Sequence, residues 1–237
     1  MIDDLHHRLH HLSTATVSMQ LLKRGLRHVF IAGVRPLRAD QPRIAGPVST
    51  LRFLPYREDL DDPARRGHPE SAQRRAIEQT PEGHVLVVET RGELGGGVLG
   101  DILATRLMSR GVAGLVTDGA VRDAEGIRAT GFPVVCAGTA APASYNVFSD
   151  GDRDLPIAVG GVAVLPGDSI LADGDGAVVI PARLVAEIVE AGEEQEKLEA
   201  WIQGEAVAGK PLPGLYPPDK ETLARYRAWL EGDAPID

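Results

Sequence analysis

The chain has 237 residues, a formal net charge of −9 and 43% apolar residues. Such a chain can form one large domain, or one domain with an appendage. The acidic balance argues against general nucleic-acid binding, which usually requires a basic face. The single cysteine, Cys136, cannot form an internal disulfide, and its apolar neighbours favour a buried structural thiol.

The N-terminal segment MIDDLHHRLHHL lacks the basic and apolar regions of a secretory signal. Apolar runs elsewhere are too short to span a bilayer. We therefore expect a cytoplasmic protein with no membrane association.

Four histidines of the N-terminal segment have the i, i+4 spacing that could place a metal site on one helical face: His6, His7, His10 and His11. An amphipathic helix that turns Leu5, Leu9 and Leu12 inward explains the same pattern without a metal. We favour the amphipathic helix, because no acidic residues accompany the histidines as second-shell partners.

The first third of the chain is expected to contain helices over residues 3–27, with a cap near Ser13. Residues 43–56 are typical of strands that are broken at Gly46 and Pro47. A polar loop over 57–70 and a helix over 71–79 follow, and their arginines are interpreted as a solvated surface: Arg65, Arg66, Arg74 and Arg75.

Residues 84 to 138 have the pattern of an α/β unit. Buried strands alternate with helices in the order 84–90, 101–111, 114–119, 123–130 and 133–138. Strand, helix and strand at this spacing predict parallel strands joined by right-handed crossovers.

The rest of the chain changes character. Residues 156–181 have no helical period and contain PGD and DGDG turns, which predicts antiparallel hairpins. A long helix is expected from 182 to about Gly204, followed by a proline-rich arm and a last short helix. We predict a domain over 1–195 and a C-terminal helical extension over 196–237.

A glycine-rich turn, GGGVLGD, precedes the helix that begins near Asp101. It is not followed by the GK[ST] of a P-loop. What remains is a group of backbone amides at a helix N-terminus, which suits a carboxylate or an enolate oxygen.

Asp101 alone would be explained by the helix dipole. However, Arg122 and Asp123 follow the next buried strand, and α/β proteins bind their ligands at the ends of parallel strands. We expect both carboxylates and Arg122 to face one cavity, where they could hold a divalent cation and a small anionic substrate.

The spacing of Asp101, twenty intervening residues and Arg122-Asp123 resembles the D-x20-R-D motif of class II pyruvate aldolases. This group includes 4-hydroxy-4-methyl-2-oxoglutarate/4-carboxy-4-hydroxy-2-oxoadipate aldolase, and it lies within the RraA-like family. RGVAGLVTDGAVRD, FPVVCAG and VLPGDSILADGDGAVVIP are also similar to that family, and the similarity runs from about residue 13 to 195. The tail with GLYPP resembles a longer subgroup.

The resemblance implies a three-layer β-β-α sandwich of the RraA-like (swivelling-domain) type, with a helical C-terminal arm. It also implies a homotrimer or dimer of trimers with the site at the subunit interface. Asp123 would bind Mg²⁺ (or Mn²⁺) directly and Asp101 through water. Arg122 would bind a 2-oxo acid and act with Asp101 in catalysis, with the backbone from Gly100 to Ile102 and Leu103 near the substrate carboxylate.

Elementary chemistry agrees with this activity, because a hard cation chelated by a 2-oxo acid stabilises the enolate of retro-aldol cleavage and of oxaloacetate decarboxylation. Two alternatives remain: a hydro-lyase acting on a 2-keto-3-deoxy sugar acid, and a non-enzymatic regulator of ribonuclease activity. Other carboxylates are expected in turns, although Asp118 could also support the metal site: Asp118, Asp168, Asp173 and Asp175.

Overall fold

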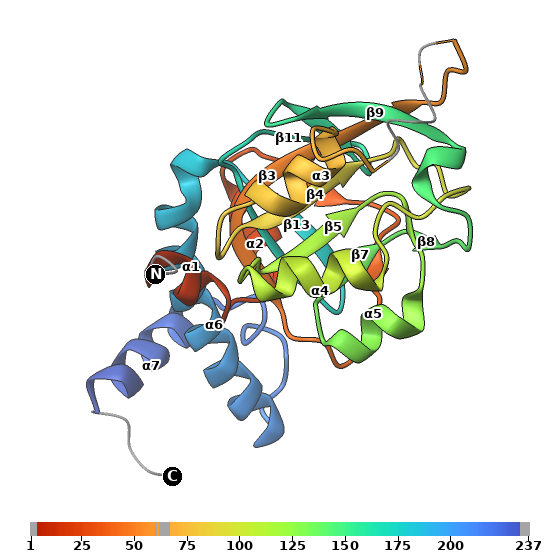
Figure 1. Ribbon diagram of the computed structural model, residues 1–237. Coiled ribbons are helices and arrows are strands. Elements are labelled where there is room, and N and C mark those ends of the chain that lie inside the picture. Colours follow the sequence, from red (N-terminus) through yellow and green to blue (C-terminus); the bar gives the residue numbers. More distant parts are fainter. Residues whose placement is uncertain (1–3, 60, 62–66, 233–237) are drawn as a thin grey trace. The chain divides into compact units, whose positions relative to one another are not determined.

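The computed structural model describes residues 4–59, 61 and 67–232, and the chain forms two compact units, Met1–Val189 and Glu190–Asp237. Figure 1 labels the elements. In chain order they are α1 (Asp4–Leu9), α2 (Thr14–Lys23), β1 (Phe30–Ile31), β2 (Arg35–Pro36), β3 (Ile44–Pro55), α3 (Ala72–Gln79), β4 (Val85–Glu89), α4 (Asp101–Ser109), β5 (Gly114–Thr117), β6 (Ala120–Val121), α5 (Ala124–Thr130), β7 (Val134–Cys136), β8 (Gly138–Thr139), β9 (Phe148–Arg153), β10 (Ile157–Val159), β11 (Val162–Val164), β12 (Ser169–Asp173), β13 (Gly176–Ile180), α6 (Val185–Val207) and α7 (Lys220–Glu231).

The first unit is built on a nine-stranded sheet in the order β1-β13-β12-β3-β4-β5-β7-β2, with β9 pairing with β3. The pairs β4–β5 and β5–β7 are parallel, as predicted for the alternating strands and helices. The pair β3–β4 is also parallel. The hairpins β10–β11 and β12–β13 are antiparallel, as predicted for the segment after residue 156.

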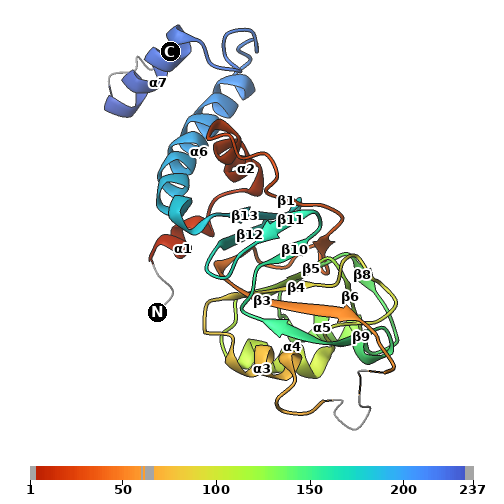
Figure 2. The same cartoon turned by 90° about the horizontal axis from the view of Figure 1, so that it is seen from above.

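The parallel strands form the middle one of three layers. Figure 2 shows α3, α4 and α5 on one side of β3, β4 and β5, and the β10–β11 hairpin on the other side. Alternate residues of each strand serve the two sides: Leu86 and Val88 pack toward the helices, whereas Val85 and Val87 pack with the hairpin residues. The predicted three-layer α/β fold with C-terminal helices is therefore confirmed.

The N-terminal helices cover β12 and β13. Leu9 and Leu12 are buried in a core with residues of these strands, and Ser13 caps α2, as predicted. The His6 Nε2 lies 2.9 Å from the Ser169 Oγ, and the His10 Nε2 lies 3.0 Å from the Arg43 carbonyl oxygen. The burial of Leu9 and Leu12 is what the amphipathic interpretation predicted. Among the described residues, no group of three or more His, Cys, Asp or Glu side chains could hold a metal.

The predicted break at Gly46 and Pro47 is wrong, because β3 runs without interruption from Ile44 to Pro55. Instead, these residues mark a change of partner: β3 pairs with β12 up to Pro47 and with β4 from Val48 onward. A Cβ at Gly46 would lie 2.2 Å from the Gly83 carbonyl oxygen, so only glycine lets the backbone at Gly83 lie this close to β3.

Two further elements differ from expectation. β9 was not predicted, because its sequence FSDGDR has no apolar alternation; it is an edge strand held by its backbone pairing with β3. The long helix, α6, begins at Val185 and continues to Val207, beyond Gly204. Residues 60 and 62–66 of the expected loop, including Arg65 and Arg66, lie outside the described part of the chain.

The second unit contains the remainder of α6 and the whole of α7. The Tyr226 ring is buried, with its centroid 5.6 Å from that of Trp201 and 6.0 Å from that of Trp229. The boundary at residues 195 and 196 stays a prediction. None of the described helices has the length and apolarity that a membrane span requires.

Candidate active site

The glycine-rich turn lies against β6, and this contact brings the start of α4 to the end of the next strand. The Val98 N–H donates to the Ala120 carbonyl oxygen at 2.9 Å, and the Arg122 N–H donates to the Leu99 carbonyl oxygen at 2.8 Å. Because α4 begins two residues after Leu99, Asp101 lies next to the pair Arg122-Asp123, as the sequence predicted.

Glycines allow the two carboxylates to approach the opposite helix. A Cβ at Gly100, which precedes α4, would lie 2.9 Å from the Asp123 Oδ2. A Cβ at Gly126, in the first turn of α5, would lie 2.9 Å from the Asp101 Oδ2. Each carboxylate therefore occupies space that a side chain on the neighbouring helix would fill, and the two helix starts form one polar site.

The backbone of Asp123 has an unusual conformation. Its φ of 51° and ψ of 42° place it in the left-handed region, which is rare for residues other than glycine. Aspartate at the residue before a helix normally caps it, but the Asp123 side chain makes no capping hydrogen bond. It instead accepts a hydrogen bond from the Arg122 Nε at 3.0 Å, so the strained backbone directs the carboxylate toward the site.

The first amides of α4 belong to this site. Gly100 precedes the helix and has no side chain to cap it. The Ile102 N–H donates to the Asp101 Oδ1 at 2.8 Å, so Asp101 and the amides form one network. The Ile102 side chain itself is 79% exposed.

The donor set suits a hard divalent cation. The Asp123 side chain is 45% exposed, so water and substrate can reach it. Mg²⁺ is typically held by one or two carboxylates, with waters and substrate oxygens completing its coordination. Asp101 and Asp123 are such a pair, and the nearby Arg122 guanidinium can bind a carboxylate or an enolate oxygen.

The other polar residues singled out in the sequence have structural roles. The Asp118 Oδ1 accepts from the N–H and the hydroxyl of Thr90, which ties the ends of β4 and β5 together. Asp168 and Asp173 accept backbone N–H groups in their turns. Burial raises the pKa of the Cys136 thiol to about 11, which fits a structural cysteine.

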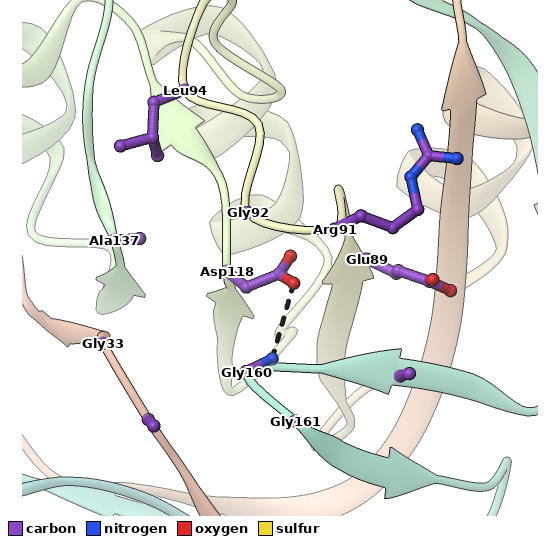
Figure 3. Close-up of a pocket in the computed structure, with 11 residues that line it drawn as sticks. Gly33, Glu89, Arg91, Gly92, Leu94, Asp118, Ala137, Gly160 and Gly161 are labelled. Atoms are coloured by element: carbon purple, nitrogen blue, oxygen red, sulfur yellow. Dashed lines mark hydrogen bonds between the residues drawn. The ribbon is translucent and has the colours of Figure 1, made fainter.

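A cavity of about 480 Å³ lies at the carboxyl ends of β4, β5 and β7 (Figure 3). Its lining includes Glu89, Arg91 and Asp118, and does not include Asp101, Arg122 or Asp123. Glu89 and Arg91 were not predicted as site residues. Their position could have indicated a site, because they are charged residues that directly follow the buried part of a parallel strand.

Known proteins resemble this chain in sequence and in fold. Protein DlpA of Legionella pneumophila is 32% identical over 67% of the chain, and a Thermus thermophilus protein named "Putative 4-hydroxy-4-methyl-2-oxoglutarate aldolase" is 39% identical over 59% of it. The crystal structure of Streptomyces coelicolor RraAS2, described as an unusual member of the RNase ES inhibitor RraA protein family, is 35% identical. It superposes with a TM-score of 0.77, covering 86% of this chain and 97% of its own.

The chain spans only 25% of the Legionella protein and 76% of the Thermus protein. A Halalkalibacterium halodurans protein with the same name as the Thermus protein is 34% identical, over 56% of this chain and 65% of its own length. The family model described as RraA-like, Aldolase/RraA, matches residues 14–179, which include every residue of the candidate site. The chain therefore belongs to the RraA-like family.

Proposed function

We propose that the chain is a divalent-metal-dependent lyase that cleaves a 4-hydroxy-2-oxo acid by a retro-aldol reaction and releases pyruvate. The observation that carries the proposal is the meeting of Asp101, Arg122 and Asp123 at the starts of two helices, with Asp123 in a left-handed conformation. The names of the Thermus and Halalkalibacterium relatives support the same class of reaction.

In this proposal Asp123 holds Mg²⁺ or Mn²⁺ directly and Asp101 holds it through water. When bound, the metal supplies Lewis-acid stabilisation of negative charge on the substrate oxygens. Arg122 has two tasks: its Nε holds the Asp123 carboxylate, and its remaining N–H groups bind the oxo-acid end of the substrate. The backbone at Ile102 and Leu103, at the start of α4, lies near the substrate carboxylate.

The reaction breaks the bond between C3 and C4. The C4 hydroxyl loses its proton, C4 becomes a carbonyl carbon, and the electron pair of the broken bond forms the enolate of pyruvate. Arg122 stabilises the charge that develops on the enolate oxygen. Protonation of C3 then gives pyruvate. Oxaloacetate would lose carbon dioxide through the same enolate, so slow decarboxylation is expected as a side activity.

A pyruvate-release assay on 4-hydroxy-4-methyl-2-oxoglutarate tests the proposal. Activity is expected with Mg²⁺ or Mn²⁺ and is expected to disappear with EDTA. Oxalate, which resembles the planar enolate, should compete with the substrate. Arg122→Lys should be poorly active, because lysine lacks the planar guanidinium that donates two parallel hydrogen bonds to a carboxylate. Absence of turnover of any 2-oxo acid in both metals, together with no effect of oxalate, would refute the lyase.

The likeness to RraAS2 favours a second candidate, a regulator that binds a ribonuclease. A regulator needs no metal, so inhibition of a ribonuclease that is unchanged by EDTA and by Asp123→Asn would support it. A hydro-lyase on a 2-keto-3-deoxy sugar acid would use the same enolate but eliminate water. Product analysis distinguishes it from the aldolase, because only the aldolase breaks a carbon–carbon bond.

A further inference from the structure

The cavity at the ends of β4, β5 and β7 has a chemical character of its own. Seven of its eleven lining residues are glycine or alanine, so the backbone forms much of its wall. Its volume of about 480 Å³ is in the range of small-ligand sites, which is roughly 300–1,000 Å³. Three charged side chains line it, and they are Glu89, Arg91 and Asp118.

Arg91 has two features that point to a ligand. Within the part of the chain that the structure describes, its guanidinium forms no hydrogen bond or ion pair with another residue. Its φ of 59° places the backbone in the left-handed region, which the side chain of arginine does not favour. Such strain persists where the surroundings require it and is concentrated at functional sites.

The two carboxylates of the cavity supply hydrogen-bond acceptors. Glu89 has no ion-pair partner among the described residues, although Arg91 lies only two positions further along the chain. The Asp118 Oδ1 is occupied by Thr90, whereas its Oδ2 has only a 3.4 Å contact from the Gly160 N–H. Figure 3 shows Glu89 and Arg91 on one side of the Asp118 carboxylate, and Leu94 and Ala137 on the other.

We propose that this cavity is a second binding site, separate from Asp101, Arg122 and Asp123, and that it takes a small hydroxylated carboxylate such as a sugar acid. Arg91 pairs with the ligand's carboxylate through two parallel N–H···O bonds. Glu89 and Asp118 accept hydrogen bonds from the ligand's hydroxyl groups. The glycine and alanine wall allows further hydroxyls to reach backbone groups. The site goes beyond the lyase activity and does not depend on it.

Isothermal titration with three probes tests the site in the intact protein. Gluconate has both a carboxylate and hydroxyls, sorbitol has the hydroxyls alone, and butyrate has the carboxylate alone. The loss of one charged hydrogen bond weakens binding by about tenfold or more, so gluconate should bind at least about tenfold more tightly than sorbitol or butyrate. Equal affinities for the three probes, or no binding of gluconate, would overturn the proposal.

Variants locate the binding. Arg91→Asn removes the guanidinium but tolerates the left-handed backbone, and it should abolish the preference for gluconate over sorbitol. Glu89→Gln should weaken gluconate and leave butyrate unchanged. Arg122→Ala is the matched control, because it removes an arginine of the other site, and gluconate binding should persist in it. Loss of binding in Arg122→Ala with retention in Arg91→Asn would place the ligand at the candidate active site and overturn the proposal.

Discussion

At the scale of single residues, Asp123 offers the sharpest test of the metal site. Asn is isosteric with Asp and also tolerates a left-handed backbone, so Asp123→Asn should keep the fold while losing the charge. If the carboxylate holds the metal, turnover should fall by about 100-fold or more, because the metal contributes several kcal/mol of transition-state stabilisation. Steady-state kinetics at saturating Mg²⁺, with circular dichroism, measure the two effects.

Asp154→Asn is the matched control for this substitution. Asp154 is also left-handed, with a φ of 57°, and is paired with Arg153 away from the site. It should have normal kinetics. Asp101→Asn should chiefly weaken metal affinity, by roughly 10-fold to 100-fold, as outer-shell changes do. Near-normal turnover in Asp123→Asn would mean that the metal assignment is wrong.

Gly100 gives a steric test of the same geometry. Its φ of −120° is ordinary for any residue, but an added Cβ would lie 2.9 Å from the Asp123 Oδ2 and would push the carboxylate away. We expect Gly100→Ala to lower metal affinity and turnover by about tenfold, with little change in unfolding, since displaced catalytic groups lose activity steeply. Metal titration followed by calorimetry measures the affinity.

The control is Gly204→Ala, because a Cβ there meets nothing within 4 Å. Alanine within α6 should raise the free energy of unfolding by roughly 0.5–1 kcal/mol and leave turnover unchanged. Equal effects of the two substitutions on activity would show that the Gly100 contact is unimportant.

The sequence predicted the closeness of Asp101 to Arg122 and Asp123, because parallel strands bring successive strand ends to one edge. Its prediction that these residues line one cavity is not matched by the cavity described above, which lies at Glu89 and Arg91. Arg91 lines the cavity with a left-handed backbone and, among the described residues, without an ion pair, and neither property is visible in a residue pattern.

At the scale of elements, apolar periodicity was sufficient where an element is uniformly apolar and buried, and it failed where most of the element is polar. β4 and β5 have uninterrupted apolar runs and were predicted to within two residues. β9 is polar and lies along the edge of β3, so nothing in FSDGDR distinguishes it from a turn. The predicted break at Gly46 and Pro47 was wrong because the same two residue types occur where a strand ends and where a continuous strand changes its pairing partner.

The contact between α1 and the sheet should weaken in acid. Burial lowers the pKa of His10, and the hydrogen bond between its ring and the Arg43 carbonyl oxygen partly offsets this shift. Burial also lowers the pKa of His84. A lowered pKa means that the unfolded chain binds protons more readily than the folded chain below about pH 6.5. The free energy of unfolding should therefore be greatest above pH 6.5 and decrease as the pH falls toward the folded-state pKa values.

Urea unfolding at pH 7.5 and pH 5.5 measures this dependence in a range where carboxylates remain charged. The decline should be smaller in His84→Asn, which removes one of the two groups. His28→Asn is the control, because His28 is exposed, and it should decline as the wild type does. A midpoint that is constant between the two pH values would contradict the assignment.

At the scale of the whole molecule, the candidate site and the cavity both belong to the first of the two units. Every residue of the candidate site and of the cavity lies in Met1–Val189. Glu190–Asp237 has its own core, with Tyr226 between Trp201 and Trp229. The family model ends at residue 179, before this second unit begins. We propose that the C-terminal extension, predicted from residue 196, is an addition to the domain that holds the candidate site.

The last prediction concerns assembly, which the family resemblance suggests is a homotrimer or a dimer of trimers. Ile102, which follows Asp101 in the candidate site, is a large apolar residue that is 79% exposed in the single chain. Exposed apolar groups beside a functional site are typical of an interface.

Light scattering after size exclusion should give three or six times the mass of one chain. Ile102→Glu should shift the protein to monomers, because a charge would be buried on assembly. Since Ile102 is exposed, its replacement should leave the monomer folded. A monomeric Ile102→Glu variant with full turnover would instead show that one chain holds the complete site.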